Sequence, residues 1–573
     1  MRKEIKSAIE SVGKSLGLGK VDFIIEHPVE MKHGDYAVNV AMVGFKKVKD
    51  KFKSSRELGE AIVEQLKAEE KMKKIAEKIT VAGPGFINIS IKNEVLVNLV
   101  GRLLKGGKEK GFLEGKKVMV EYTDPNPFKE LHIGHLYSNI VGESLARLFE
   151  ASGAEVKRAN YQGDVGMHVG KSLWGMKKKL GEEKLSLKNL EKKSLKERQK
   201  FMGQAYALGA TAYEKDKQAK KEIEELNEKI YKLDEEIKEL YEKGREWSLE
   251  YFETIYKRLG TKFDEYFFER EAAEAGLKIV KTGLKKGVFT KSQGAVVYKG
   301  EKEGLHTRVF VNKMGLPTYE AKDLGLAVMK YEKYKYDQSV IVTGNEINEY
   351  FRVVLAAMKK VKPELWKKTR HVGHGMVRLP AGKMSSRTGK IIMAEWLLNE
   401  AKKQALKIMK QSEVKNKAEV AEMVGKAAVK YALLRSGIGQ DVVFDFGSSV
   451  SFEGNSGPYL QYTYARCRSV LEKAKVEVKT PKAGRVNKEE EMILRTVYKF
   501  EEVVEEAARE LAPNVVVNFL YDLAQKYNSF YNKHRILKEE KETKEFRLWL
   551  TTAVKKVIKD GLYLLGVEAP ERM

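Results

Sequence analysis

Residues 118–156 read VMVEYTDPNPFKELHIGHLYSNIVGESLARLFEASGAEV. Their hydrophobic pattern changes from that of a strand to that of a helix. Residues 118–123 are typical of a buried strand, and DPNP at 124–127 ends it. A helical spacing of three and four follows, with apolar residues Ile133, Leu136, Ile140, Val141, Leu145 and Leu148. A second strand is predicted over 155–161, before the turn GDVG at 163–166. Strand, loop, helix and strand in this order predict a parallel α/β sheet.

The rest of the chain divides into regions by pattern. Residues 1–92 are expected to form a small α+β unit, since helical spacing opens it and GPGFINISI at 83–91 alternates like a strand. We assign the α/β region to 93–400, a connecting helical segment to 401–454 and a helical bundle to 455–573. Candidate strands at 295–298, 308–311 and 339–342 predict that the parallel sheet resumes late in the α/β region.

A long, polar, helical insertion is expected at about 177–258. Its apolar residues step by three and four: Ile223, Leu226, Ile230, Leu233, Ile237 and Leu240. A coiled-coil hairpin would show this spacing, but so few heptads do not specify a separate coil. We therefore expect ordinary packing of one helix against another.

Composition favours a partner that is a polyanion. The chain has 573 residues, with 107 Lys+Arg and 81 Asp+Glu, so its net charge is +26. A solvated surface rich in lysine and glutamate could also give this net charge, without a polyanionic partner. The single cysteine, Cys467, excludes a disulfide framework and a multi-cysteine metal site. Without a long apolar run or a signal-peptide pattern at the N-terminus, a cytoplasmic protein is expected.

HIGH at 132–135 is placed where the strand has ended and the helix begins. The start of a helix offers unpaired N–H groups and the positive end of the dipole, which suit phosphate. Gly134 lets a flat base or ribose approach the backbone. His132 and His135 can both donate hydrogen bonds to a triphosphate as charge builds on it. Two histidines in the first turn of an ordinary helix, without any role in phosphate binding, would give the same motif.

The second motif is KMSSR at 383–387, within LPAGKMSSRTGK. Lys383, Arg387 and Lys390, with Gly382 and Gly389 as hinges, could form a mobile cationic clamp for a leaving pyrophosphate. Alone, this would be one more basic loop in a basic chain. HIGH and KMSSR in this order, about 250 residues apart, are a far more specific pair.

HIGH followed by a KMSKS-like loop resembles the class I aminoacyl-tRNA synthetases. The flanking segments resemble the arginyl-tRNA synthetases: RANYQGDVGMHVG at 158–170, LPTYEAKDLGLA at 316–327, GNSGPYLQYTYARCRS at 454–469 and GLYLLGVEAPERM at 561–573. HGDYAVNVAM at 33–42 and GPGFINI at 83–89 are similar to the additional N-terminal domain of that family. The resemblance implies a Rossmann-like parallel-sheet catalytic domain, an N-terminal α+β domain that contacts tRNA, and an all-α anticodon-binding bundle.

The resemblance also implies roles for individual residues. His132 and His135 would contact ATP and stabilise the transition state of adenylation, and Gly134, His374, Met376 and Lys383 would complete the ATP site. Lys129, Lys383 and Arg387 would neutralise the pyrophosphate, Lys129 compensating for Ser386 in the second motif. Glu121, Asn126, Tyr319 and Asp323 would bind arginine. A helix-capping acid at Asp323 and a strand-end salt bridge at Glu121 are the structural alternatives.

For tRNA, the resemblance implies contacts by Tyr36 and Asn39 in the N-terminal domain and by Tyr459, Tyr527 and Tyr531 in the bundle. Aromatic rings amid basic residues stack on unpaired bases, but such rings also fill the cores of helix bundles. Tyr462, Tyr464 and Phe530 share this ambiguity. The sequence departs from the family at Val165, at His168 and at Ile347, which stands where glutamine is common. A substrate contact there would come from Glu346 or Asn348, or be absent.

The sequence therefore predicts an arginine–tRNA ligase that uses ATP with Mg²⁺, binds arginine and its tRNA, carries no structural metal and is a monomer. The family resemblance further implies that arginine activation needs bound tRNA. Two alternatives are a nucleotidyltransferase of the HxGH kind and a non-catalytic tRNA-binding relative. The first leaves both outer regions without a role, and the second is expected to lose signature residues, whereas His132, His135, Lys383 and Asp323 are all present.

Overall fold

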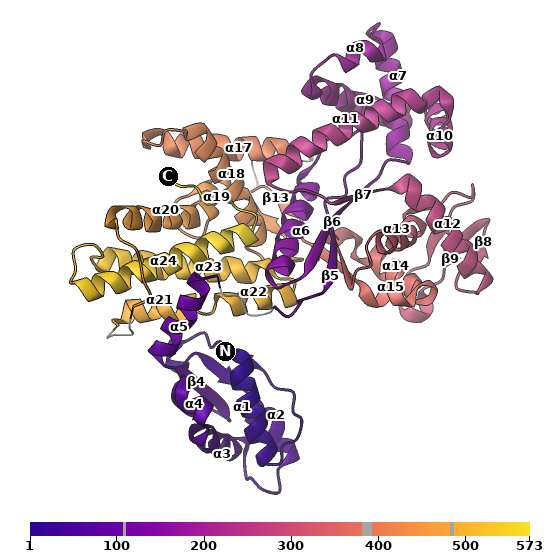
Figure 1. Cartoon of the computed structure of the whole chain (residues 1–573). Helices are drawn as coiled ribbons and strands as arrows, with labels where there is room; N and C mark the ends of the chain where they lie inside the picture. The colour runs from indigo at the N-terminus through magenta and orange to yellow at the C-terminus, as the bar shows by residue number, and fades with distance from the viewer. Residues whose placement is uncertain (107–110, 381–391, 482–485) are drawn as a thin grey trace. The chain divides into compact units, whose positions relative to one another are not determined.

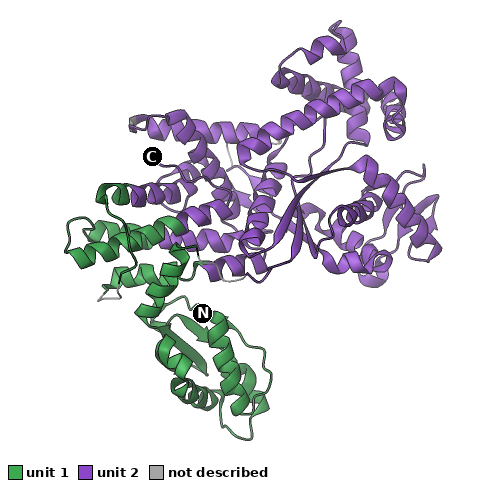
Figure 2. Cartoon of the chain, in the orientation of Figure 1, with its two compact units in different colours: residues 1–108, 469–500, 525–556 green, residues 109–468, 501–524, 557–573 purple. Residues whose placement is uncertain are grey.

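The structure is a computed structural model that describes residues 1–106, 111–380, 392–481 and 486–573. The chain forms two compact units (Figures 1 and 2). Unit 1 comprises residues 1–108, 469–500 and 525–556, and unit 2 comprises 109–468, 501–524 and 557–573. The C-terminal helices are thus shared between the two units.

Unit 1 contains an antiparallel sheet in the order β1-β2-β4-β3 among its described residues. The strands are β1 (Ile25–Glu26), β2 (Tyr36–Val38), β3 (Ala76–Ala82) and β4 (Phe86–Ile91). Alternate residues Ile87, Ile89 and Ile91 of β4 are buried, which confirms the strand predicted from GPGFINISI. The helices of this region are α1 (Arg2–Ser15), α2 (Val40–Gly44), α3 (Ser55–Ala68), α4 (Glu70–Ile75) and α5 (Asn93–Leu104).

The central sheet of unit 2 is parallel throughout and has the order β12-β11-β5-β6-β7 among the residues described (Figure 1). Its strands are β5 (Lys117–Glu121), β6 (Glu155–Gln162), β7 (Glu265–Phe268), β11 (Gln338–Gly344) and β12 (Thr369–His374). The chain order reverses between β5 and β11. This is the switch point at which doubly wound sheets bind ligands, beyond the carboxyl ends of the strands.

The prediction that 295–298 and 308–311 rejoin the parallel sheet is wrong. These residues are β9 (Ala295–Tyr298) and β10 (Arg308–Val311). Strand β9 pairs antiparallel with β10 on one side and with β8 (Thr290–Ser292) on the other. Gln293 and Gly294 between β8 and β9 both have positive φ, of 50° and 83°. Such a two-residue turn closes a tight hairpin, whereas a parallel pair needs a crossover connection. Of the three candidates, 339–342 alone joins the parallel sheet, within β11.

Helices fill the region between β6 and β7, from Met167 to Leu259. They are α7 (Met167–Glu182), α8 (Leu187–Glu191), α9 (Leu195–Lys215), α10 (Lys217–Lys232) and α11 (Glu235–Leu259). Leu233 adopts a left-handed conformation and separates α10 from α11, so the apolar series from Ile223 to Leu240 is divided between two helices. Both helices bury their apolar faces in one core, as ordinary helix packing predicts.

The remaining helices of the α/β region are α6 (Ile133–Ala151), α12 (Glu269–Lys285), α13 (Tyr319–Lys333), α14 (Asn348–Val361) and α15 (Pro363–Lys368). The short strands β13 (Val377–Arg378) and β14 (Val442–Val443) pair parallel. The later helices are α17 (Ala394–Ile408), α18 (Lys417–Leu434), α19 (Phe446–Val450), α20 (Gly457–Ala474), α21 (Lys488–Val497), α22 (Phe500–Arg509), α23 (Pro513–Lys533) and α24 (Lys541–Leu564). Among the described residues, none of the helices is long and apolar enough to cross a membrane.

The final part of α24 and the turn after it are held against α6 within unit 2. The Ser144 hydroxyl donates to the Leu564 carbonyl at 2.9 Å, and Arg147 donates to the Tyr563 carbonyl at 2.8 Å. Buried Lys430 of α18 donates to the carbonyls of Leu259 and Gly566. These cations and hydroxyls satisfy carbonyl groups that the ends of α11 and α24 leave unpaired.

Candidate active site

The loop between β5 and α6 is held in an uncommon backbone conformation at the switch point. Thr123, Asp124 and Phe128 have φ angles of 77°, 42° and 70°, in the left-handed region that non-glycine residues rarely adopt. Ser138 of α6 accepts the Thr123 N–H at 2.9 Å and donates to the Val342 carbonyl of β11 at 2.8 Å. This fixes the start of α6 between β5 and β11.

The same loop is anchored in the helical insertion by Phe128. Its ring is fully buried in the core of the insertion, and its N–H donates to Ser248 Oγ at 2.8 Å. A Cβ added at Gly244 of α11 would lie 2.2 Å from the ring. The insertion therefore sets where the backbone runs just before HIGH.

HIGH opens α6, as predicted, with His132 as its N-cap residue rather than part of the helical face. His132 Nδ1 accepts the Gly134 N–H, and His135 Nδ1 accepts the His132 N–H, each at 3.1 Å. The rings stack with centroids 3.7 Å apart. Since both Nδ1 atoms are acceptors, each neutral ring carries its proton on Nε2.

Both histidines are held in the neutral form. Burial lowers the pKa of His132, and the Lys129 charge lowers it further. Burial lowers the pKa of His135 well below its ordinary value, with further contributions from His132 and Lys129. The pair therefore offers two neutral N–H donors rather than two cations.

The chain that follows the second motif returns to HIGH. Lys383 and Arg387 lie outside the described residues. From Ile392 the chain is described again, and the Ile392 carbonyl accepts the Ile133 N–H at 2.8 Å. The Ala394 N–H donates to the Leu131 carbonyl at 2.9 Å. Lys129, the residue implied to assist the second motif, has its ammonium 4.3 Å from the centre of the Tyr206 ring.

His374 lies at the end of β12, beside α6. It is buried, its ring centroid lies 4.4 Å from that of Tyr137, and its Nδ1 donates to the Gly375 carbonyl at 2.8 Å. Nε2 is therefore an acceptor, and no hydrogen-bond partner for it is found among the described residues. Met376 exposes its side chain, while its N–H donates to Asp441 and its carbonyl accepts from Val442, each at 2.8 Å.

Four carboxylates lie near the carboxyl ends of β5 and β7 and on α13; Glu121 and Glu269 are buried, and Asp124 and Asp323 are partly buried. We call Glu121, Asp124, Glu269 and Asp323 the acidic cluster. Glu121, the last residue of β5, forms an ion pair with buried Lys330, so the strand-end salt bridge does form. Glu269 pairs with buried Lys322 at 2.8 Å. Burial and Glu121 together raise the pKa of Asp124 well above its ordinary value.

Asp323 lies in the second turn of α13, so it is not a helix cap. Its Oδ2 accepts a hydrogen bond from the Tyr350 hydroxyl at 2.6 Å. Burial, together with the charges of Glu121 and Glu269, raises the pKa of Asp323 to about 7. Tyr319 begins α13 and exposes 55% of its surface, with Lys322 Nζ 4.9 Å from its ring centre.

Asn126 is brought to the same region by Gly163. A Cβ at Gly163 would lie 2.2 Å from Asn126 Oδ1, so this close approach requires glycine. Ile347 ends a single 3₁₀ turn and is partly exposed. Burial lowers the pKa of both His132 and His374, and the charge of the neighbouring Glu346 partly opposes that lowering, so Glu346 acts on the side of the site near HIGH.

The residues implied to contact tRNA fall into two groups. Tyr36 and Tyr527 are fully buried, so neither ring is accessible to RNA in this structure, and for Tyr527 burial supports the core alternative. Phe530 and Tyr464 are buried as well. Tyr531 and Tyr462 each expose 38% of their surface, and Tyr459 is half-buried. Asn39 is half-buried, and its Oδ1 accepts the Ile24 N–H at 2.8 Å.

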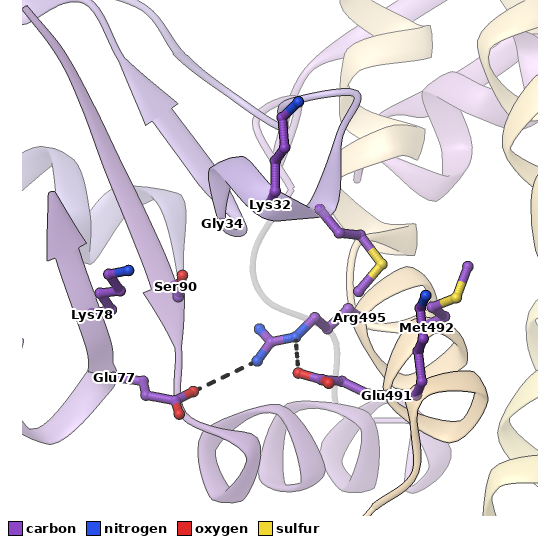
Figure 3. A pocket seen from close by; sticks show the side chains of 10 residues that line it. Lys32, Gly34, Glu77, Lys78, Ser90, Glu491, Met492 and Arg495 are labelled. Atoms are coloured by element: carbon purple, nitrogen blue, oxygen red, sulfur yellow. Dashed lines mark hydrogen bonds and ion pairs between the residues drawn. The ribbon is translucent and has the colours of Figure 1, made fainter. Parts of the chain in front are cut away.

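A groove of about 610 Å³ lies between the sheet of unit 1 and α21 (Figure 3). Lys32, Lys78, Lys488, Arg495, Glu77 and Glu491 provide the charged groups of its lining. Arg495 lies against Glu491, with Nε at 2.9 Å from Oε1, and also pairs with Glu77 and Asp35. Neither Tyr36 nor Asn39 lines this groove, which contains more basic than acidic groups.

Sequence reasoning missed Tyr350 and Lys330. Tyr350 lies near the departure at Ile347, but only the packing of α13 against α14 brings its hydroxyl to Asp323. Lys330 is seven residues after Asp323, a spacing that returns it to the same face of the helix. That spacing was a signal by which Lys330 could have been found.

Comparisons with protein families agree with this arrangement. Residues 98–446 match a model described as tRNA synthetases class I (R), catalytic domain. Residues 460–573 match a DALR anticodon binding domain, and residues 1–91 match an arginyl tRNA synthetase N terminal domain.

Similar proteins span the whole chain. A protein of Porphyromonas gingivalis named arginine–tRNA ligase is 31% identical over 572 residues, which is 94% of each chain. One of Flavobacterium psychrophilum with the same name is 31% identical over 519 residues, 85% of each chain. A Thermus thermophilus arginyl-tRNA synthetase structure matches all of both chains with a TM-score of 0.83 and 25% identity. A Plasmodium falciparum structure, 22% identical, shares the fold with a TM-score of 0.81.

Proposed function

Since the chain belongs to the arginyl-tRNA synthetases, a family of aminoacyl-tRNA ligases, we propose that the start of α6 is where it activates arginine. An arginine carboxylate oxygen attacks the α-phosphorus of ATP, supplied as its magnesium complex. The bond from that phosphorus to the bridging oxygen breaks, and pyrophosphate leaves. The arginyl group then passes from the adenylate to the 3′-terminal ribose of tRNA, and AMP is released.

The stacked histidines carry this proposal. With each Nδ1 bound to backbone N–H, the two Nε2–H groups are fixed donors that need no reorganisation as negative charge builds on the phosphate oxygens. The positive end of the α6 dipole adds to this stabilisation. We assign the pyrophosphate charge to Lys129 together with Lys383 and Arg387. The chain at 392–394 leads away from that second motif directly beside HIGH.

The acceptor Nε2 of His374 supports its place in the ATP site. A buried acceptor without a protein partner needs a donor, and the exocyclic amino group of adenine supplies one. The backbone N–H of Met376 is bound to Asp441, so we assign adenine recognition to His374 rather than to that N–H.

The acidic cluster supports arginine as the amino acid. It has four carboxylates and two buried lysine partners, Lys322 and Lys330, among the described residues. This excess of negative charge suits a cationic side chain. Asp124 and Asp323 pair with neither lysine. Asp124 Oδ1 accepts the Tyr161 N–H at 2.9 Å, and Asp323 is the acid that the family resemblance implies, so we assign the guanidinium to Asp323. We propose that Asn126 and Glu121 lie beside the α-amino and carboxylate groups of the bound arginine, and that Tyr319 lies at the entrance of the arginine site.

We propose that tRNA is bound by the N-terminal region, residues 1–92, through Asn39, and by the helices of 455–573 through the exposed ring of Tyr531 and the half-buried ring of Tyr459. The protein is proposed to act as a monomer, with 93–400 as its catalytic domain and 401–454 as the connecting segment.

Pyrophosphate exchange tests the assignment, with tRNA present and each of the standard amino acids supplied in turn. Exchange that depends on arginine alone is expected. Exchange with another amino acid, or none under any condition, would contradict the proposal. Omitting tRNA tests whether activation requires it, and exchange should then be lost.

A further inference from the structure

Tyr350 makes a hydrogen bond that bears on the amino-acid site. Its hydroxyl donates to Asp323 Oδ2 at 2.6 Å, from α14 to α13. Among the described residues, it is the one donor to this carboxylate. Lys330, the nearby cation, is paired with Glu121 instead.

Asp323 faces charged and titratable groups from every element packed around it. These are Glu121 of β5, Asp124 of the following loop, Tyr161 of β6, Glu269 of α12, Tyr319 and Lys330 of α13, and Tyr350 of α14. The acids oppose ionisation of Asp323, whereas Lys330 and the Tyr350 hydroxyl favour it. A donor at 2.6 Å acts more strongly than a cation that is committed to another acid.

The Tyr350 ring is held rigidly. It packs against the core formed by α13, α14 and the antiparallel sheet, and its centroid lies 5.2 Å from that of Phe351. The Arg308 guanidinium of β10 lies 5.3 Å from the Tyr350 ring centre, and Arg308 in turn pairs with Glu320 at 3.2 Å. The hydroxyl therefore has a fixed direction relative to α13.

We infer that Tyr350 is a positioning residue for arginine: its hydroxyl holds the Asp323 carboxylate ionised and fixes its plane for the guanidinium. This inference rests on the proposed role of Asp323. A carboxylate has acceptor capacity on both oxygens. Once Tyr350 occupies one site on Oδ2, the remaining acceptor sites are directed to the planar fork of donors that arginine presents.

Tyr350→Phe removes the hydroxyl and keeps the ring. In pyrophosphate exchange with tRNA present at pH 7.5, the KM for arginine should rise about 10- to 100-fold, the cost of losing a hydrogen bond to a charged group. The KM for ATP should stay within about twofold, as ATP does not use Asp323. The pH at which the arginine KM begins to rise should move upward, since the lost donor favoured the ionised acid.

Tyr298→Phe is the matched control. Tyr298 lies in the same core, and its hydroxyl donates to the Glu303 carboxylate at 2.7 Å, away from the acidic cluster. It should leave the arginine KM and its pH profile unchanged. Replacing Tyr350 with 3-fluorotyrosine, a stronger donor of nearly the same size, keeps the test decisive if Tyr350→Phe does not fold. It should shift the profile to lower pH.

Asp323→Asn separates this inference from the proposed function. Suppose that Asp323→Asn raises the arginine KM but neither Tyr350 variant changes it or its pH profile. Tyr350 is then a core residue, and the inference is overturned while the site stands. If Asp323→Asn also leaves the arginine KM unchanged, the assignment of the guanidinium site itself is wrong. A fall in kcat alone, without a pH shift, would also overturn the role of Tyr350.

Discussion

At the scale of single residues, the His132–His135 pair makes the clearest prediction. His135→Ala removes one fixed N–H donor and leaves the buried stretch of α6 intact. Adenylate formation should fall by two or more orders of magnitude, since one preorganised donor contributes roughly 2.7–4 kcal/mol. Exchange kinetics measure the loss, and circular dichroism checks the fold. Pyrophosphate exchange at a near-normal rate would show that His135 does not stabilise the transition state of adenylation.

Asp323 makes a second prediction at this scale, which concerns pH. Its pKa is raised to about 7, and the guanidinium contact that we propose for it needs the ionised form. The arginine KM should therefore rise as pH falls through about 7, while the KM for ATP stays flatter. Asp323→Asn should raise the arginine KM strongly at every pH and abolish this dependence. Should the Asn variant keep wild-type affinity, Asp323 is a structural acid.

At the scale of elements, the close approach of Gly244 to the Phe128 ring links the helical insertion to the loop between β5 and α6. Gly244→Ala places a methyl group against the Phe128 ring, so we expect a loss of about 1–3 kcal/mol in the free energy of unfolding and slower adenylate formation. Urea unfolding and exchange measure the two effects. Gly203→Ala on α9 is the control, since its Cβ meets nothing within 4 Å. Equal behaviour of both variants would show that the insertion does not position the loop.

A buried acid fastens α21 to the sheet of unit 1. Asp35 accepts the Ile91 N–H at 2.7 Å, the Tyr498 hydroxyl at 3.2 Å and a hydrogen bond from Arg495. Asp35→Ala leaves the largely buried Arg495 without one of its acids, and the unfolding free energy of unit 1 should fall by about 3–5 kcal/mol. Exposed Asp22→Ala should change it little. Denaturant curves that coincide for the two variants would contradict this role.

The sequence predicted elements better than it predicted their neighbours. Hydrophobic period and the motif at 132–135 correctly predicted β5, α6 and β6, because these depend on local pattern. Strand partners depend on turn geometry, and the positive φ of Gln293 was not foreseen. The acidic residues of the site could be predicted from the resemblance to the family. The contact of Tyr350 with Asp323 could not, because it arises from the packing of α13 against α14. Burial likewise decided which tyrosines remain available to RNA.

At the scale of the whole molecule, we expect net charge to govern the proposed tRNA binding. A chain of charge +26 displaces counterions from RNA phosphates, so affinity should fall steeply with salt. Filter binding from about 50 to 200 mM salt should show a loss of about 10³-fold or more if six or more phosphates are contacted. Tyr531→Ala should weaken binding without changing that slope, because stacking carries no charge. A flat salt response would refute an electrostatic origin.

The hydrogen bonds from α6 to the end of α24 also have a consequence for synthesis. Ser144 and the Leu564 carbonyl that it binds are 420 residues apart in the chain. At about 5–20 residues per second, a ribosome needs roughly 20–80 s to make the intervening chain. During that interval, the helix that carries HIGH is already outside the exit tunnel, while its late partner has not been translated. Nascent chains should therefore acquire their final active geometry only after Leu564 has emerged.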